Sequence, residues 1–472
     1  MWWAGWDPLL LIAMACAAVL AGSHAVVNAR TPQGAIGWIL IILLVPVVAL
    51  PVYMVLGPAS RRRMRASRHA VERGRIAGAD PGPEDDSGDE PVGDDSLRVF
   101  ERLSGQNASR GNDVELLIDG EQTYEALFDA IETAEKYLLI QFYIVRDDEI
   151  GRRLKSAVLE RAQAGVKVFM LNDAFHGVGL PWRWVRQLKK YGVEVRAPQG
   201  PRGPLGRFQI NYRNHRKMLI VDGRVAFTGG LNIGLEYLGL DPAYGPWRDT
   251  HIRVTGPMIA RFQDDFRIDW RWSAGADPDV ELNWDIPPDP RDMCGLVMAP
   301  APTSRIETGN MYFTALIQSA DVRLWIATPY CVPDSDVLAA LKLAGLRGVD
   351  VRLVVPDRAD HYLPWLAAFT YFDELREAGV EIWRYTAGFL HEKVVLVDDC
   401  LVSIGTVNLD IRSCMLNFET TAIVADHDFA LEVEAMLEAD LARSMRMERT
   451  LDDQPLWLRT GAQVARLMAP LL

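Results

Sequence analysis

Cysteine is scarce in this chain of 472 residues, with five copies far apart and none in a C-x-x-C pair. Isolated cysteines in odd number indicate neither a zinc site nor a disulfide framework. A surplus of basic residues is also missing, because 50 Lys and Arg stand against 63 Asp and Glu, for a net charge of −13. This balance argues against a general nucleic-acid binder, which presents a strong basic footprint.

Two long apolar runs open the chain, at residues 8–27 and 35–57. Each is about long enough to cross a bilayer core as a helix, and Pro46 and Pro51 are expected to kink the second, which a membrane helix tolerates. The arginine-rich stretch RRRMRASR follows at residues 61–68. Because positive charge accumulates on the cytoplasmic side of membrane proteins, we expect a transmembrane hairpin within residues 1–60 and a cytoplasmic catalytic part. The alternative is a buried helical hairpin in a soluble core.

The segment after the arginines changes sign: ADPGPEDDSGDEPVGDDS, residues 79–96, is acidic and rich in Pro and Gly. Residues 61–96 are therefore predicted to form a linker, basic and then acidic, that is solvated and disordered. A calcium site is the alternative, but the spacing does not fit an EF-hand loop.

The remaining sequence alternates amphipathic helical patterns with short apolar runs, which is typical of α/β units. The alternation occurs twice. We expect two similar domains at residues 97–278 and 291–448, each a sheet flanked by helices and related by a pseudo-twofold. An amphipathic tail at residues 449–472 completes the prediction, either lying in the membrane interface or packing as an ordinary helix.

One motif occurs in both halves, as HRKMLIVDGRVAFTGGLN at residues 215–232 and HEKVVLVDDCLVSIGTVN at residues 391–408. The two copies align without a gap over their whole length. The matched pairs are His215 with His391, Lys217 with Lys393, Asp222 with Asp398, Gly229 with Gly405 and Asn232 with Asn408. A single H-x-K would be noise, but two copies at the same spacing indicate a function.

The residue types of the motif suit a phosphate group. The apolar runs that follow predict a strand, on which His and Lys two positions apart face the same side. Lys neutralises phosphate oxygens, and His attacks phosphorus or moves protons. The G-G-x-N and G-T-x-N turns, with Gly229, Gly405, Asn232 and Asn408, supply further donors to an anion. Asp222 and Asp398 belong to the candidate catalytic set, although their position beyond the strand favours a bracing role.

Each histidine also needs an acceptor that orients its ring. The sequence NFETTAIV after the second copy matches PWRDTHIRV after the first, so Glu419 corresponds to Asp249. Both are predicted to hydrogen-bond an imidazole, and an ordinary strand-edge carboxylate is the alternative. If the halves pack face to face, the two histidines converge on one phosphorus.

At these residues the sequence resembles the phospholipase D superfamily, and within it the bacterial cardiolipin synthases with two membrane helices. Thr406 stands where Ser or Gly is usual. The resemblance implies a phosphohistidine intermediate with no metal or other cofactor, and transfer between two phosphatidylglycerol molecules to give cardiolipin and glycerol. It also implies His215 as nucleophile and His391 as acid and base, an order that the pseudo-symmetry leaves open. Arg412 and Asn417 either hold substrate or support structure.

The implied partners are phosphatidylglycerol and anionic membrane lipid, with no nucleic acid, and the implied location is the bacterial inner membrane with a multi-pass anchor. The alternatives are a membrane-bound phospholipase D or another phosphatidyltransferase, then a membrane-anchored phosphodiesterase or nuclease, and last an inactive scaffold. The oligomeric state is not indicated by the sequence.

Overall fold

The computed structural model describes residues 7–29, 31–73, 95–173, 180–197, 212–304 and 306–469. The chain divides into two compact units. The first comprises Met1–Pro81 and Gln199–Tyr212, and the second comprises Gly82–Pro198 and Arg213–Leu472. Residues 74–94, which include most of the predicted acidic linker, lie outside the described residues.

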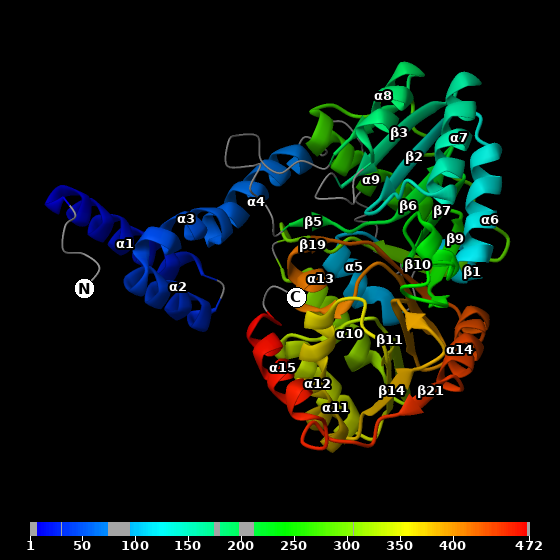
Figure 1. Cartoon of the computed structure of the whole chain (residues 1–472). Helices are drawn as coiled ribbons and strands as arrows, with labels where there is room; N and C mark the ends of the chain where they lie inside the picture. Colours follow the sequence, from blue (N-terminus) through cyan, green and yellow to red (C-terminus); the bar gives the residue numbers. More distant parts are fainter. Residues whose placement is uncertain are drawn as a thin grey trace. The chain divides into compact units, whose positions relative to one another are not determined.

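The first unit is helical (Figure 1). Its helices in the described residues are α1 (Pro8–Asn28), α2 (Pro32–Leu44), α3 (Pro46–Leu56) and α4 (Pro58–Arg73). Among the described residues, α1 alone is long and apolar enough to cross a membrane, with 21 residues. The predicted first span is therefore present as a helix.

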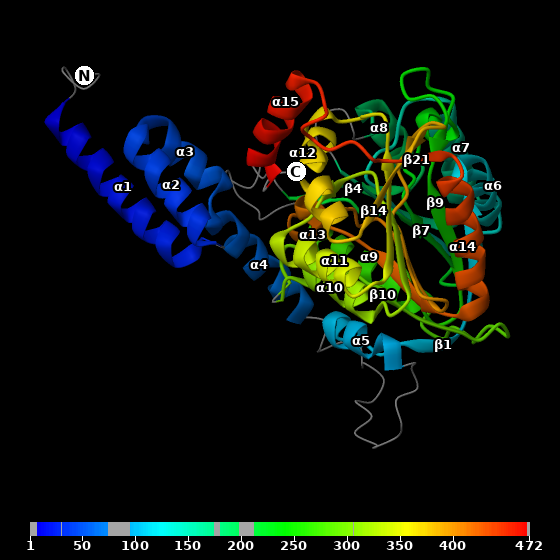
Figure 2. The ribbon, with the colours of Figure 1, turned by 90° about the horizontal axis from the view of Figure 1, so that it is seen from below.

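The second predicted span is not one continuous helix. The helix breaks at Val45, whose backbone angles are φ −138° and ψ 63°, because the ring of Pro46 crowds the residue before it. The results are α2 with 13 residues and α3 with 11, each shorter than a bilayer requires. Helix α1 lies beside α2 (Figure 2), and the ring of His24 hydrogen-bonds the Tyr53 hydroxyl at 2.7 Å.

The first half of the second unit alternates helices with strands. After η1 (Asp95–Leu97) and α5 (Arg98–Ser104), its elements are β1 (Ser109–Ile118), α6 (Asp119–Glu132), β2 (Tyr137–Phe142), α7 (Glu149–Gln163), β3 (Lys167–Asn172), α8 (Trp182–Lys190), β4 (Glu194–Arg196), β5 (Arg213–Asn214), β6 (Met218–Val221), β7 (Val225–Gly229), η3 (Leu235–Leu238), β8 (Trp247–Arg248), β9 (Thr250–Thr255) and α9 (Ile259–Ala274). Local chemistry sets these boundaries. Asp148, for example, caps α7 by accepting the Gly151 amide at 2.9 Å.

The second half repeats the order. Its elements are β10 (Met293–Met298), α10 (Thr308–Ser319), β11 (Arg323–Ala327), β12 (Cys331–Val332), α11 (Ser335–Leu346), β13 (Asp350–Pro356), α12 (Tyr362–Glu377), β14 (Glu381–Tyr385), β15 (Phe389–Leu390), β16 (Val394–Val397), β17 (Leu401–Gly405), β18 (Leu409–Asp410), α13 (Ile411–Met415), β19 (Asn417–Phe418), β20 (Thr421–Ala425), α14 (His427–Leu441), β21 (Ser444–Arg446) and α15 (Leu456–Leu467).

The strands confirm the predicted α/β class and its internal repeat. The first half orders its strands β1-β9-β7-β6-β2-β3-β4, and the second orders them β10-β20-β17-β16-β11-β13-β14, with β21 at the edge. Equivalent strands occupy equivalent places, and the antiparallel pair β1–β10 joins the halves into one sheet of 15 strands. The halves are thus related by a pseudo-twofold, while the predicted domain boundaries stay a prediction.

Three apolar clusters hold these layers together. Helices α6, α7 and α8 cover one face of the first half, and α10, α11, α12 and α15 cover one face of the second (Figure 1). The third cluster combines strands of both halves with α9 and α14. Strands such as β2 are buried along their whole length, as expected for strands covered on both faces.

The C-terminal tail contains α15, which packs against α12 through Leu458, Ala462 and Ala465. Its other face is exposed and apolar, with Trp457 61% and Leu467 80% accessible. The packing role is therefore present, and contact of the exposed face with a membrane stays a prediction.

Candidate active site

The histidine and lysine of each motif copy lie immediately before a strand. His215 and Lys217 precede β6, and His391 and Lys393 precede β16, so the prediction that these residues lie on the strand is wrong, and each strand begins three residues after its histidine. The lysines turn back onto the motif itself: Nζ of Lys217 donates to the carbonyl oxygen of His215 at 2.9 Å. Lys393 makes the same contact with the carbonyl of His391.

Two short strand pairs bring each motif against the opposite half. β5 pairs in parallel with β19, and β8 pairs in parallel with β15. The amide of His215 donates to the carbonyl of Phe418 at 2.9 Å, and the amide of His391 donates to that of Arg248 at 2.8 Å. The next residue in each partner segment is the predicted carboxylate. Each histidine therefore faces a carboxylate from the other half of the chain.

Glu419 orients His215. Nδ1 of His215 lies 2.9 Å and 3.0 Å from the two carboxylate oxygens of Glu419. The same carboxylate accepts from the Thr406 hydroxyl at 2.5 Å and from the Asn417 amide at 3.0 Å. Burial would raise the pKa of Glu419, but the neighbouring His215 and Lys217 hold it below its ordinary value. Asn417 thus supports the carboxylate, while Arg412 lies close enough to Glu419 to interact electrostatically.

Asp249 orients His391 in the same way. Its Oδ2 lies 2.8 Å from Nδ1 of His391 and 3.3 Å from the indole nitrogen of Trp247. Its Oδ1 accepts from the Thr250 amide at 2.9 Å. Burial would raise the pKa of Asp249, but His391 and Lys393 keep it below its ordinary value. Both carboxylates are therefore ionised, and each fixes a ring at Nδ1 so that Nε2 is left for chemistry.

Burial dominates the protonation of the cationic groups. It lowers the pKa of His215, and together with Lys393 it lowers the pKa of His391 to about 4. It also lowers the pKa of Lys217 to about 7 and that of Lys393 to about 8. The charge of Lys393 contributes to the lowered pKa of Lys217, which places both motif copies within electrostatic reach of each other. An anion placed among these groups would stabilise their charged forms.

The motif glycines allow close approach of the chain segments that carry and follow the two carboxylates. A Cβ on Gly230 would lie 1.9 Å from Oδ1 of Asp249, and a Cβ on Gly405 would lie 2.4 Å from the Thr420 carbonyl. Gly229 is equally close to His251, with 2.4 Å from an added Cβ to Nδ1. These residues are therefore required for packing beside the site, and direct contact of their amides with phosphate stays a prediction.

The two motif asparagines differ. Asn232 bridges the Ile144 amide at 3.0 Å and the Tyr237 hydroxyl at 2.8 Å. The side-chain oxygen of Asn408 is buried and has no hydrogen-bond partner among the described residues. The repeat is thus symmetric in sequence at this position and asymmetric in contacts.

Asp222 and Asp398 bind backbone amides. Asp222 accepts from the amides of residues 135, 136 and 137 at 2.7–2.8 Å. Asp398 accepts from those of residues 321, 322 and 323 at 2.8–3.0 Å. Each carboxylate fixes the chain that enters β2 or β11, which agrees with the predicted bracing role. Among the described residues, none of these contacts supports a direct catalytic role for Asp222 or Asp398.

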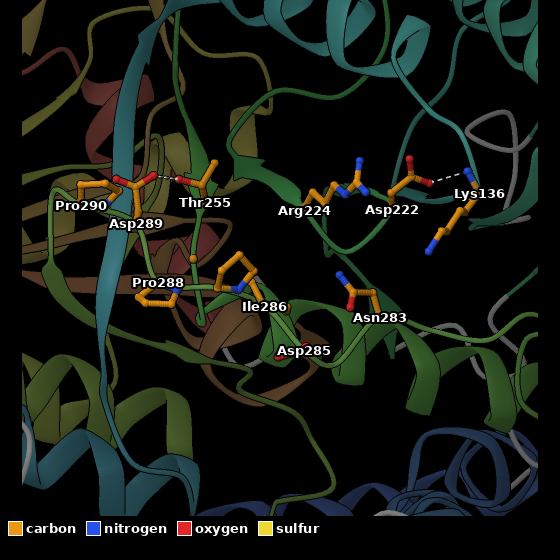
Figure 3. A pocket seen from close by; sticks show the side chains of 12 residues that line it. Lys136, Asp222, Arg224, Thr255, Asn283, Asp285, Ile286, Pro288, Asp289 and Pro290 are labelled. Carbon is orange, nitrogen blue, oxygen red and sulfur yellow. Dashed lines mark hydrogen bonds between the residues drawn. The ribbon is translucent and has the colours of Figure 1, made fainter.

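A cavity of about 520 Å³ lies beside Asp222 (Figure 3). Lys136, Arg224 and the proline-rich segment 283–290 line it. Neither motif histidine is among its lining residues. The candidate active site therefore consists of the motif histidines, lysines and their carboxylate partners, and this cavity lies outside it.

Sequence reasoning missed the buried charges behind the histidines. Arg216, the middle residue of the first H-x-K, is 1% exposed and pairs with Asp269 at 3.0 Å. The equivalent Glu392 is fully buried and pairs at 3.0 Å with Arg248, which also binds Asp440 at 2.8 Å. The sequence contained a signal for these residues. In an extended H-x-K segment the middle side chain points away from His and Lys and into the core, so a charged residue there predicts a buried ion pair.

Comparison with known proteins adds to this geometry. The family model described as "Cardiolipin synthase, PLD-like domain" matches residues 127–243 and 313–441. Cardiolipin synthase A of Pseudomonas aeruginosa is 42% identical over 475 residues, covering 98% of this chain and 96% of that protein. Cardiolipin synthase A of Pseudomonas syringae is 42% identical over 461 residues, covering 96% and 95%.

The fold also occurs in solved structures of other proteins. The phosphatidylserine synthase of Haemophilus influenzae superposes with a TM-score of 0.58 at 16% identity, covering 80% of this chain and all of that one. At this identity the likeness concerns architecture alone.

Proposed function

This chain belongs to the cardiolipin synthase family of phospholipase D-like proteins, and from that membership we propose that it joins two phosphatidylglycerol molecules into cardiolipin and glycerol. One observation carries the proposal: two histidines from equivalent positions each have Nδ1 held by a carboxylate of the opposite half. This arrangement leaves two Nε2 atoms, one to attack phosphorus and one to handle protons.

The first step forms a covalent intermediate. The Nε2 lone pair of His215 attacks the phosphorus of the donor, and the bond from phosphorus to the headgroup glycerol oxygen breaks. His391 gives its Nε2 proton to that oxygen, so glycerol leaves neutral. Glu419 stabilises the positive charge that develops on the His215 ring, because its ionised carboxylate contacts Nδ1.

The second step reverses the roles. A headgroup hydroxyl of the second phosphatidylglycerol gives its proton to Nε2 of His391 and attacks phosphorus. The bond between phosphorus and nitrogen breaks, cardiolipin forms, and His215 regains its lone pair. Lys217 and Lys393 neutralise the phosphate oxygens in both steps when protonated.

We propose His215 as the nucleophile and His391 as the acid, in the order that the family resemblance implies. Asp360, a second carboxylate, lies within electrostatic reach of His391 and favours its protonated form. His215 has Glu419 as its carboxylate neighbour. Asp360 offsets only part of the effect of burial and Lys393, which lower the pKa of His391 to about 4, so the ring needs a further negative charge before it can carry a proton to the leaving oxygen. The bound phosphodiester adds a further negative charge and raises the pKa of His391 from its low value in the empty site.

Product analysis tests the proposal. The purified full chain in detergent receives phosphatidylglycerol alone, and mass spectrometry follows the lipids. We expect cardiolipin and glycerol in equal amounts, and neither product from His215→Ala or His391→Ala with unchanged circular dichroism. Phosphatidic acid without cardiolipin would show a phospholipase D, and full activity in either variant would refute the two-histidine mechanism.

We further propose that residues 1–60 anchor the protein in the bacterial inner membrane as a multi-pass hairpin, with the catalytic unit in the cytoplasm. The apolar α1 supports one crossing, and the return crossing would use the apolar helices α2 and α3 in succession, since each alone is too short. The arginines near the start of α4 support the cytoplasmic side for the catalytic unit. Single cysteines placed at Thr31 and Ser67 in a cysteine-free chain test it with an impermeant thiol reagent on intact cells. Labelling of Thr31→Cys alone is expected, and labelling of Ser67→Cys alone would overturn the orientation.

A further inference from the structure

Three polar side chains form a compact cluster where β13 leads into α12. The Tyr330 hydroxyl donates to Oδ2 of Asp360 at 2.5 Å, and Nδ1 of His361 lies 2.9 Å from the same oxygen. The amide of His361 donates to Oδ1 of Asp360 at 2.5 Å. Most of the Asp360 side chain is buried, whereas that of His361 is 72% exposed. The cluster is thus held from inside and open on one side.

Asp360 lies within electrostatic reach of His391 and Lys393. The backbone supports this placement, because β12, which directly follows Tyr330, pairs with β18, which directly follows the motif residue Asn408. The Thr328 hydroxyl ties the two segments by donating to the Tyr330 carbonyl at 3.1 Å and accepting from the Leu409 amide at 3.2 Å.

The Asp360 carboxylate retains capacity for another donor. A carboxylate offers about four acceptor positions, and the contacts to Tyr330 and to the amide and ring of His361 use three of them. The Tyr330 oxygen donates to Asp360 and also lies 3.2 Å from Nδ1 of His361, and its second lone pair can still accept. The following residues Tyr362 and Leu363 are 69% and 48% exposed, so an amphiphilic molecule would find apolar surface beside the polar groups.

The opposite side of the site has a different polarity. After β3, in the first half, Asp173 lies 3.8 Å from Arg213 as an ion pair. Arg213 and Arg412 are close enough for their charges to interact, near His215 and its partner Glu419. A carboxylate and a tyrosine lie on both sides, as Asp173 and Tyr143 near His215 and as Asp360 and Tyr330 near His391. The sides differ in their partners, because Asp173 is ion-paired with Arg213, whereas Asp360 pairs with His361. The arginines suit a phosphate near His215, and Asp360 suits a neutral polyol near His391.

We propose that Asp360, Tyr330 and His361 form the subsite for the headgroup glycerol, holding the leaving glycerol of the donor and the headgroup of the acceptor lipid beside His391. Asp360 accepts from a glycerol hydroxyl other than the one that reacts. This contact directs the remaining hydroxyl toward Nε2 of His391 and distinguishes a polyol from water or a simple alcohol. The inference rests on the proposed function, because it assigns the acceptor used in that reaction.

A competition between acceptors tests the subsite. The full chain receives phosphatidylglycerol in detergent with added ethanol, and the ratio of cardiolipin to phosphatidylethanol is measured. Both products arise from the same phosphatidyl-enzyme, so the ratio reports the acceptor step alone. Because a hydrogen bond to a charged group is lost, Asp360→Asn is expected to lower the ratio on the order of 10- to 100-fold. Tyr330→Phe should lower it by a smaller factor.

The matched control is Asp357→Asn, a change of the same kind three residues earlier. Asp357 pairs with Arg384 at 2.8 Å, and the ratio should stay at the wild-type value. A ratio of cardiolipin to phosphatidylethanol in Asp360→Asn equal to that of the wild type would overturn the subsite, whether the amounts of both products stay the same or fall together. Failure of the proposed function is distinguishable, because it would appear as absence of cardiolipin from the wild-type protein.

Discussion

Neutralising the carboxylate behind His215 should slow the reaction by about three orders of magnitude. Glu419 lies 2.9 Å from Nδ1 of His215 in a fully buried position, and its charge offsets the positive charge of the phosphohistidine. With about 4 Å between charge centres and an effective dielectric constant of about 20, the interaction contributes about 4 kcal/mol. Since about 1.4 kcal/mol corresponds to tenfold in rate, Glu419→Gln is expected to reduce the rate about 10³-fold.

The contacts of Glu419 allow the glutamine to fit. Its amide oxygen can take the position of Oε1, which accepts from Asn417 and lies 3.0 Å from Nδ1 of His215. The amide nitrogen then faces Thr406, whose hydroxyl can turn to the Thr420 carbonyl at 3.1 Å, and the His215 ring keeps its hydrogen bond by turning toward the amide oxygen. The variant therefore removes the charge with little change of shape. A loss of stability alone would not explain the expected rate.

Single-turnover formation of the phosphatidyl-enzyme from phosphatidylglycerol is the assay, because the charge develops in that step. Glu434→Gln is the control, since Glu434 is ion-paired with Arg323 and loses the same charge elsewhere. A rate within tenfold of wild type in folded Glu419→Gln would refute the electrostatic role of this carboxylate.

Two further predictions concern the lysines and the glycines. Lys217 and Lys393 have pKa values lowered to about 7 and about 8 and bind phosphate only when protonated, so kcat/KM should fall as pH rises from about 7 to about 9. A profile that stays level to about pH 10, the ordinary range of lysine, would contradict this assignment. Gly230→Ala places a Cβ 1.9 Å from Asp249 and should cost about 1–3 kcal/mol of unfolding free energy, measured by denaturant, with reduced cardiolipin formation. Equal stability and activity would show that Asp249 has room to move.

The sequence alone predicted the α/β class and its duplication, because strands and helices leave periodic patterns that occur twice. It also predicted a kink in the second membrane run, because Pro46 and Pro51 lie within residues 35–57. The structure places the interruption at Val45, where the ring of Pro46 crowds the residue before it, and divides the run into the separate helices α2 and α3.

The candidate site shows the same division between local pattern and tertiary contact. The repeated spacing selected His215 and His391 and the carboxylates Asp249 and Glu419, since a duplicated motif preserves intervals along the chain. Which carboxylate serves which histidine was decided by the pairing of β5 with β19 and of β8 with β15 across the halves. Sequence separation carries no information about such contacts between distant segments, and the depth of burial that sets the protonation of the site exists only once both halves have packed together.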